Sequence, residues 1–303
     1  MLDKISVTAP KGLAFDNQGN LLIASEKRIV RVSRSDKTLR TLTGSTTSPY
    51  RIDVDRTNGD ILVAESGTNQ QIKHFNSSGV LLATYGWLGG RAFGLYNPND
   101  FRAMTDISSD QQGGFLVSER SAPRRVARFD RNGRLVKEWF GGANWTPQAT
   151  PETGNPSVVW AQADQEGEYL RLTLDDAART WKVHSVYRPE ILEGEMLFTF
   201  GVSDALNPYR VNGRLYLAHQ ARNVEVWLID ESNWTLKPVS AARFEADQGN
   251  LWIRTDANGD GAAQASECRR FNKNIYGSIV RKLFANQKSV TRISKYPDEH
   301  ENR

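Results

Sequence analysis

The sharpest chemical pattern in the sequence is a loop over residues 256–267, which reads Asp-Ala-Asn-Gly-Asp-Gly-Ala-Ala-Gln-Ala-Ser-Glu. Side chains that end in oxygen stand at loop positions one, three, five, nine and twelve, namely Asp256, Asn258, Asp260, Gln264 and Glu267. Gly261 falls at position six, where the loop must turn sharply, and Ala262 offers a backbone carbonyl at position seven. Calcium takes oxygen ligands at this spacing, so the loop predicts a structural calcium site with Glu267 as a bidentate ligand.

The same loop resembles the EF-hand loop, in the form that dockerins and other secreted proteins carry, although no flanking helices are evident. Only three of the ligands are anionic, Asp256, Asp260 and Glu267, which predicts a modest affinity suited to an extracellular module. The alternative interpretation is an Asp-, Asn- and Gly-rich hairpin turn that binds no ion.

A repeated sequence pattern runs along most of the chain. A turn-forming glycine, one further residue and a run of strand-forming residues recur six times, starting at Gly19, Gly59, Gly113, Gly167, Gly213 and Gly249. Subtraction gives spacings of 40, 54, 54, 46 and 36 residues, a period typical of propeller blades. Asn-, Asp- and Gly-rich turns separate the short apolar runs, so each unit predicts a meander of four antiparallel strands.

Residues 10–25, 28–33 and 49–86 resemble the NHL-repeat β-propeller family, as does the third unit of the chain, and the calcium loop favours a bacterial member. The resemblance implies an all-β, six-bladed propeller that forms one domain over residues 1–303. The expected blades are 10–44, 48–86, 98–141, 156–201, 206–240 and 242–294, with a strand at 5–9 pairing with the C-terminal strands to close the ring. Five blades plus a fragment, or seven blades, are alternatives.

Alignment of the repeats places charged residues at one mouth of the predicted central channel. Arginine stands four residues before the aspartate that ends the first strand in three units, at Arg51, Arg102 and Arg243, and nearly there at Arg210. The ends of the second strands carry Glu65, Glu119 and His219. One interpretation is a pocket whose arginines bind a carboxylate, sulfate or phosphate in bidentate fashion. The other is mutual pairing of arginine and glutamate at the rim.

Composition and charge set broad limits on the class of protein. The 303 residues carry 39 Lys and Arg against 35 Asp and Glu, a net charge of +4 that permits anionic partners without requiring nucleic acid. No apolar run approaches the roughly 18 residues of a membrane helix, and the first residues lack the apolar stretch of a signal peptide. The single cysteine, Cys268, excludes an internal disulfide, and four dispersed histidines do not match the zinc cage of propeller lyases.

We therefore expect a scaffold that binds an anionic small molecule, a glycan or a protein partner on one channel face. We expect it outside the cytoplasm or secreted, with a cytoplasmic location as the alternative. The rival hypothesis is a lactonase-like propeller hydrolase or lyase, with a metal ion in the channel that Glu65 and Glu119 help to hold. A third is RNA binding through the arginine-rich stretch 120–134, which predicts an affinity that falls steeply with salt. The ligand, the oligomeric state and whether the chain is part of a longer protein are left open.

Overall fold

The computed structural model describes residues 4–141, 149–163, 168–189, 205–220, 223–245, 250–259 and 264–271. Every regular element of these residues is a β-strand, apart from one 3-10 turn at Ala265–Glu267. Accordingly, none of these ranges contains a helix that is long and apolar enough to cross a membrane. The predicted all-β class is confirmed.

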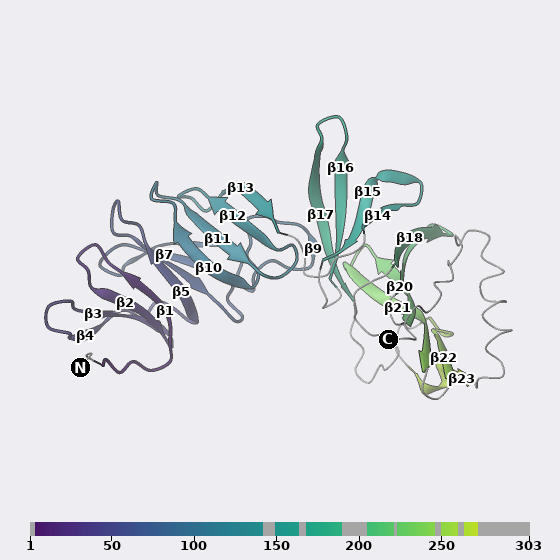
Figure 1. Ribbon diagram of the computed structural model, residues 1–303, viewed down its shortest axis with the longest axis horizontal. Helices are drawn as coiled ribbons and strands as arrows, with labels where there is room; N and C mark the ends of the chain where they lie inside the picture. The colour runs from purple at the N-terminus through teal and green to yellow at the C-terminus, as the bar shows by residue number, and fades with distance from the viewer. Residues whose placement is uncertain are drawn as a thin grey trace, which may run out of the picture.

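The first half of the chain forms three separate four-stranded antiparallel sheets, each a simple meander. The first sheet contains β1 (Pro10–Phe15), β2 (Leu21–Ser25), β3 (Arg28–Val32) and β4 (Leu39–Thr43). The second contains β5 (Pro49–Val54), β6 (Ile61–Glu65), β7 (Ile72–Phe75) and β8 (Leu81–Tyr85). The third contains β10 (Met104–Ser109), β11 (Phe115–Glu119), β12 (Arg125–Phe129) and β13 (Leu135–Phe140). The innermost strands β1, β5 and β10 contact one another in succession, so the sheets pack face to face as propeller blades do (Figure 1).

Short polar turns explain why these strands begin and end where they do. Asp16 follows β1, and its Oδ1 accepts the N–H groups of Gln18 and Asn20 at 3.0 and 2.8 Å. Gly19 supplies the left-handed conformation of this turn, with φ of 79°. Equivalent bonds close the later turns at Asp110 and Asp130, so one local device shapes the repeated hairpins.

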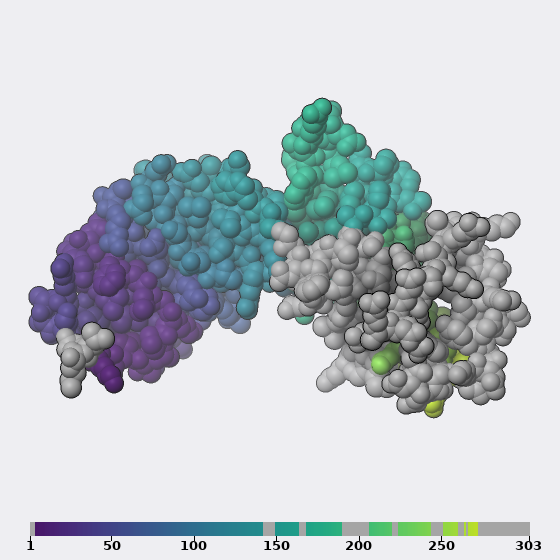
Figure 2. Space-filling model, in the orientation of Figure 1, coloured from purple at the N-terminus to yellow at the C-terminus, as the bar shows by residue number. Residues whose placement is uncertain are grey.

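Apolar side chains fill the two gaps between the three sheets. β6 is buried along its whole length, and its alternate residues contribute to different clusters. Ile61 and Val63 pack toward the first sheet, whereas Leu62 and Ala64 pack toward the third. In the space-filling view the three sheets accordingly form one continuous body, coloured purple to teal (Figure 2).

The second half of the chain differs from the expected separate blades. It contains β14 (Ala149–Glu152), β15 (Asn155–Gln162), β16 (Tyr169–Asp175), β17 (Thr180–Pro189), β18 (Ala205–Val211), β19 (Arg214–Gln220), β20 (Asn223–Asp230), β21 (Thr235–Glu245), β22 (Asn250–Thr255) and β23 (Cys268–Phe271). With β9 (Gly94–Leu95) these strands form one sheet of eleven. Two meanders, β14–β17 and β18–β21, are joined by a parallel bridge of only two residue pairs, Arg188 with Thr235 and Pro189 with Leu236.

The long strand β21 removes the expected boundary between the fifth and sixth units. It includes both the predicted last strand of one unit and the predicted first strand of the next. Residues 239–243 read Val-Ser-Ala-Ala-Arg and lack the strongest turn formers, Gly, Asn, Asp and Pro, so the strand continues through them.

The predicted strand at 5–9 does not form. Ala9 has φ of 44°, which interrupts an extended chain, and Thr8 instead accepts a hydrogen bond from the Ser25 hydroxyl through its carbonyl. The strands expected within 278–294 lie outside the described residues. The blade count and the closure of the ring therefore stay predictions.

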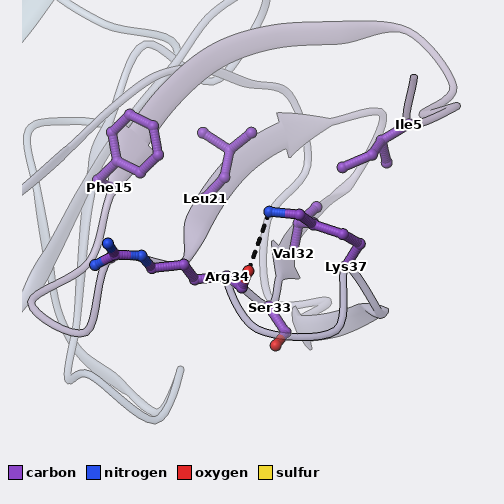
Figure 3. A pocket seen from close by; sticks show the side chains of 8 residues that line it. Ile5, Phe15, Leu21, Val32, Ser33, Arg34 and Lys37 are labelled. Atoms are coloured by element: carbon purple, nitrogen blue, oxygen red, sulfur yellow. Dashed lines mark hydrogen bonds between the residues drawn. The ribbon is translucent and has the colours of Figure 1, made fainter. Parts of the chain in front are cut away.

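The outer face of the first sheet is apolar and only partly covered. Ile23, Val30 and Val32 are buried on this face, with Val7 packed against them. Leu13 and Phe15 on β1 are 62% and 55% exposed. Figure 3 shows Ile5, Phe15, Leu21 and Val32 around a cavity of about 380 Å³ on this sheet. This is the face against which a ring-closing blade is predicted to pack.

Packing between the second and third sheets yields a test of the fold. Gly133 has φ of 73°, and a Cβ atom there would lie 2.2 Å from a ring atom of Tyr85. We expect Gly133→Ala to lower the free energy of unfolding by about 1–2 kcal/mol for the left-handed backbone, and by a further 1–3 kcal/mol or so for the overlap. Gly154→Ala is the control, because Gly154 has φ of 82° and no atom within 4 Å of its Cβ position. Equal losses in urea unfolding would contradict the described contact between the sheets.

Candidate functional site

The ends of the second strands hold the start of each inner strand in place. The residues paired there across the first three sheets are Ser25 with Pro10, Glu65 with Pro49, and Glu119 with Met104. Glu65 Oε1 accepts the N–H of Thr47 at 2.5 Å, and Glu119 Oε1 accepts the N–H of Arg102. The repeat alignment is therefore correct at these positions, and both glutamates bond the chain as it enters the inner strand.

Glu119 also lies at the centre of a buried ion-pair network. Arg125 is fully buried on β12 and donates through Nε to Glu119 Oε2 and through Nη1 to Glu138 Oε2, the latter at 2.8 Å. The Arg91 guanidinium lies 3.4 Å from both carboxylate oxygens of Glu119. Two arginines thus face two glutamates, which balances the charge that burial would otherwise penalise.

Electrostatics keep the arginine of this network ionised. Burial lowers the pKa of Arg125, but the Glu119 carboxylate, Tyr96 and the hydrogen bonds to Glu119 and Glu138 together outweigh this, so the pKa lies above its usual value. Tyr96 donates its hydroxyl to Glu138 at 2.6 Å. Burial raises the pKa of Tyr96 despite the opposing arginines, so the phenol stays neutral and able to donate.

The contacts of Arg91 and Arg125 with Glu119 were not predicted from the sequence. Arg125 faces Glu119 directly across the β11–β12 hairpin, a pairing that strand-by-strand register would have revealed. Arg91 comes from the long connection between the second and third sheets, which has no counterpart in the repeat.

Arg51 sits on β5 and is held by neutral groups. Its Nε donates to the carbonyl of Thr105 at 3.1 Å, Nη2 donates to the hydroxyl of Tyr50 at 3.1 Å, and Nη1 lies 3.5 Å from the carbonyl of Lys11. The guanidinium also stacks 4.0 Å from the centre of the Tyr50 ring. No carboxylate pairs with it among the residues that the structure describes.

Arg102 occupies the corresponding place on the third sheet. Its guanidinium donates to the carbonyl of Arg91 at 2.9 Å and lies 3.9 Å from the centre of the Phe93 ring. Glu168, the residue just before β16, approaches it at 3.9 Å. The structure therefore brings Arg51, Glu65, Arg102 and Glu119 to the same ends of neighbouring sheets.

The other three predicted mouth residues lie in the eleven-stranded sheet. Arg210 on β18 pairs with Glu152 at 3.0 Å, and Arg243 on β21 stands opposite Asn223 and Trp252. His219 on β19 is buried, with Nδ1 3.5 Å from Glu225 Oε2. The Tyr169 ring meets the imidazole edge to face at 6.1 Å, and burial together with Glu225 raises the pKa of this tyrosine.

The calcium loop is described in part. Asp260 and Ala262 lie outside the described residues, whereas Asp256, Asn258, Gln264 and Glu267 lie within them. Glu267 Oε1 accepts the N–H of Ala257 at 2.9 Å, which brings the two ends of the loop together. The buried Arg254 guanidinium lies 3.4 Å from Glu267 Oε2 and competes for this carboxylate. Within the described ranges no three His, Cys, Asp or Glu side chains gather closely enough to hold a metal ion.

Comparison with known proteins shows no family for this chain. No family model and no curated protein matches the chain. Among solved structures it is similar to a protein from Lactobacillus plantarum at 11% identity, covering 88% of this chain and 86% of that one, with a TM-score of 0.35. It is also similar to the Cps50 (Swd1) β-propeller domain from Myceliophteria thermophila at 12% identity, covering 90% and 88%, with a TM-score of 0.35. A chain of the nidogen/laminin complex matches at 16% identity, covering 75% and 78%, also with a TM-score of 0.35.

Because these TM-scores are below 0.5, the class of the protein rests on its own sheets. The chain is an all-β protein whose first half forms three four-stranded antiparallel sheets, packed like the blades of a β-propeller, while the described strands of its second half form one larger sheet. Membership of the NHL-repeat family stays a prediction.

The buried network around Glu119 yields a second test of stability. Glu119→Gln leaves Arg91 and Arg125 with one carboxylate fewer, so we expect the free energy of unfolding to fall by about 3–5 kcal/mol. Glu26→Gln is the control, because its 3.7 Å pair with Arg28 is solvated and worth less than about 1 kcal/mol. A loss in Glu119→Gln no larger than in the control would show that the network does not stabilise the fold.

Proposed function

We propose that this protein is a binding module that takes an anionic small molecule, or an acidic group of a glycan or protein partner, at Arg51. The observation that carries the proposal is the environment of that guanidinium. It is held in place by carbonyl and hydroxyl oxygens, and its positive charge meets no carboxylate within the described chain. A fixed but uncompensated guanidinium is the arrangement that binds a carboxylate, sulfate or phosphate well.

The surroundings of Arg51 support this role. Lys11 lies beside it, is exposed, and forms no ion pair among the residues that are described. Arg102 presents a second guanidinium at the same end of the next sheet. Since the groups around Arg51 already fix its side chain, little side-chain freedom is lost when a ligand binds.

The lactonase-like alternative is less well supported by the glutamates. It needs Glu65 and Glu119 to present oxygens to an ion in the channel. Glu65 Oε2 accepts a hydrogen bond from Asn69 at 2.7 Å and lies 3.5 Å from Lys73, while its Oε1 bonds Thr47. Both oxygens of Glu119 are bonded as well. These carboxylates hold strands together, which favours a binding role for the arginines beside them.

We further propose that the loop 256–267 binds calcium in a structural role. The oxygen side chains at its described positions fit a hard cation, and the Glu267 bond to Ala257 draws the loop closed. Arg254 shares the Glu267 carboxylate and lowers the gain from an ion, which supports weak binding of the kind found outside the cytoplasm.

Binding at Arg51 is tested with a hexaglutamate peptide and inorganic phosphate as probes in NMR titrations. We expect shifts at residues 10–12, 49–52 and 102–105, and an affinity that falls about tenfold or more in Arg51→Gln. Arg40→Gln, on the outermost strand of the first sheet, removes the same charge and leaves the affinity unchanged. A single-stranded RNA that binds more tightly than either probe, with a steep salt dependence, would favour the RNA alternative. Equal effects of both variants would refute a specific site.

The calcium loop is tested by calorimetry and thermal melting. We expect binding with a dissociation constant of about 10⁻⁴–10⁻³ M and a rise in melting temperature with calcium. The double variant Asp256→Asn with Glu267→Gln loses both effects, whereas Asp176→Asn, an exposed turn residue outside the loop, retains them. The absence of any calcium heat and any change in melting temperature in the unaltered protein would show that the loop is only a turn.

A further inference from the structure

One position on the third strand carries a different type of side chain in the second sheet than in the first and third sheets. The third-strand residues that stand opposite Leu22, Leu62 and Leu116 are Arg31, His74 and Arg128. In the first and third sheets the arginine reaches the aspartate that follows the inner strand: Arg31 to Asp16 at 3.1 Å and Arg128 to Asp110 at 2.8 Å. In the second sheet the corresponding aspartate, Asp55, bonds its own turn at Thr57 instead.

His74 pairs with a different acid. Its Nε2 lies 2.9 Å from Oδ2 of Asp60, a residue whose counterparts in the other two sheets are Asn20 and Gly114. The second sheet thus differs from the other two at two residues that contact each other. The His74 ring replaces a longer arginine side chain, and the Asp60 carboxylate replaces an uncharged residue. An imidazole fills less space than an arginine side chain, and a cavity of about 440 Å³ lies here between the second and third sheets.

Polar contacts hold the His74 ring at both of its nitrogens. Nδ1 lies 3.2 Å from the Tyr85 hydroxyl, which itself donates to the carbonyl of Arg131 at 2.6 Å. Nε2 lies 2.9 Å from Oδ2 of Asp60, which also accepts a hydrogen bond from the Asn58 amide at 3.0 Å. The ring is therefore fixed between the second and third sheets, with Asp60 Oδ1 on the side of the carboxylate that it does not contact.

Several groups that line the cavity have unused bonding capacity. The amide oxygen of Gln111 accepts the N–H of Arg56 at 2.8 Å and that of Gln112 accepts Nη2 of Arg128 at 2.9 Å, which leaves both NH₂ groups as donors. Oδ1 of Asp60 accepts nothing from the described residues. The exposed guanidinium of Arg131 likewise has no hydrogen-bond or ion-pair partner in that part of the chain. The cavity thus combines free donors, one carboxylate acceptor and one unpaired cation.

We infer that this cavity binds a sugar acid, a ligand that carries both hydroxyl groups and a carboxylate. Its lining residues are all polar apart from one glycine. Asp60 Oδ1 accepts a hydroxyl, the glutamine NH₂ groups donate to hydroxyl oxygens, and Arg131 pairs with the carboxylate in bidentate fashion.

This cavity is distinct from the proposed Arg51 site. Asp60 precedes β6 and Glu65 ends it, so the two lie at opposite ends of one strand. The inference does not depend on the Arg51 proposal, and Arg51→Gln is expected to leave binding in the cavity unchanged.

The experiment is an NMR titration of the full chain with D-glucuronate, with D-glucose as the neutral comparison. We expect glucuronate to shift the amides of residues 57–60, 111–113 and 131–132, and to bind at least about tenfold more tightly than glucose. Arg131→Gln should remove that preference, while Arg134→Gln, an exposed arginine of the same turn, should retain it. His74→Arg restores the residue of the other two sheets and should abolish binding with the melting temperature preserved.

Three outcomes would overturn the inference. These are no shift at the cavity with millimolar glucuronate, equal affinity for glucose and glucuronate, and undiminished binding in a folded His74→Arg protein. Should His74→Arg fail to fold, Arg131→Gln decides alone, because its side chain is exposed and makes no bond within the described fold.

Discussion

The fold of the first half depends on burial of both faces of the second strand in its first two sheets. β6 shows this most fully, since its odd and even residues enter two different apolar clusters. A sheet that is apolar on both faces is not stable alone in water and needs a neighbour on each side. Face-to-face packing of the meanders follows directly, and the aromatic cluster of Tyr85, Phe115 and Phe129 completes it between the second and third sheets. On the outer face of the first sheet the described residues meet this requirement only in part, since Leu13 and Phe15 stay exposed beside the buried Ile23, Val30 and Val32.

Buried charge decides which polar groups remain for function. Glu65 and Glu119 are removed from water at the ends of their strands, and each must be fully bonded to be tolerated there. Main-chain N–H groups and the arginines of the Glu119 network satisfy them. At this end of the sheets Arg51 keeps an uncompensated positive charge, because its hydrogen-bond partners are all neutral groups. The repeat therefore leaves uncompensated charge or bonding capacity at two places. One is Arg51, and the other is the His74 cavity at the opposite end of the sheets.

The sequence by itself determined the class of fold and the position of most strands. Glycine and Asx turns recur with strand-forming runs, and both signals are local, so the three meanders of the first half and most strands of the second were predictable from the residues. The same alignment correctly placed Glu65 and Glu119 at equivalent strand ends, because register within a hairpin follows from turn length. The ligand spacing of the loop 256–267 is likewise a property of sequence alone, and its calcium site is a prediction.

Only the tertiary structure decided what those residues touch. Arg91 reaches Glu119 from a connection outside the repeat, and Glu168 approaches Arg102 from just before β16, contacts that no periodic pattern contains. The second half merged into one sheet because strand pairing depends on which edges meet, whereas the repeat specifies only strands and turns. The His74 cavity also required the structure, since an imidazole in place of an arginine becomes a binding site only when a neighbouring sheet supplies the other wall.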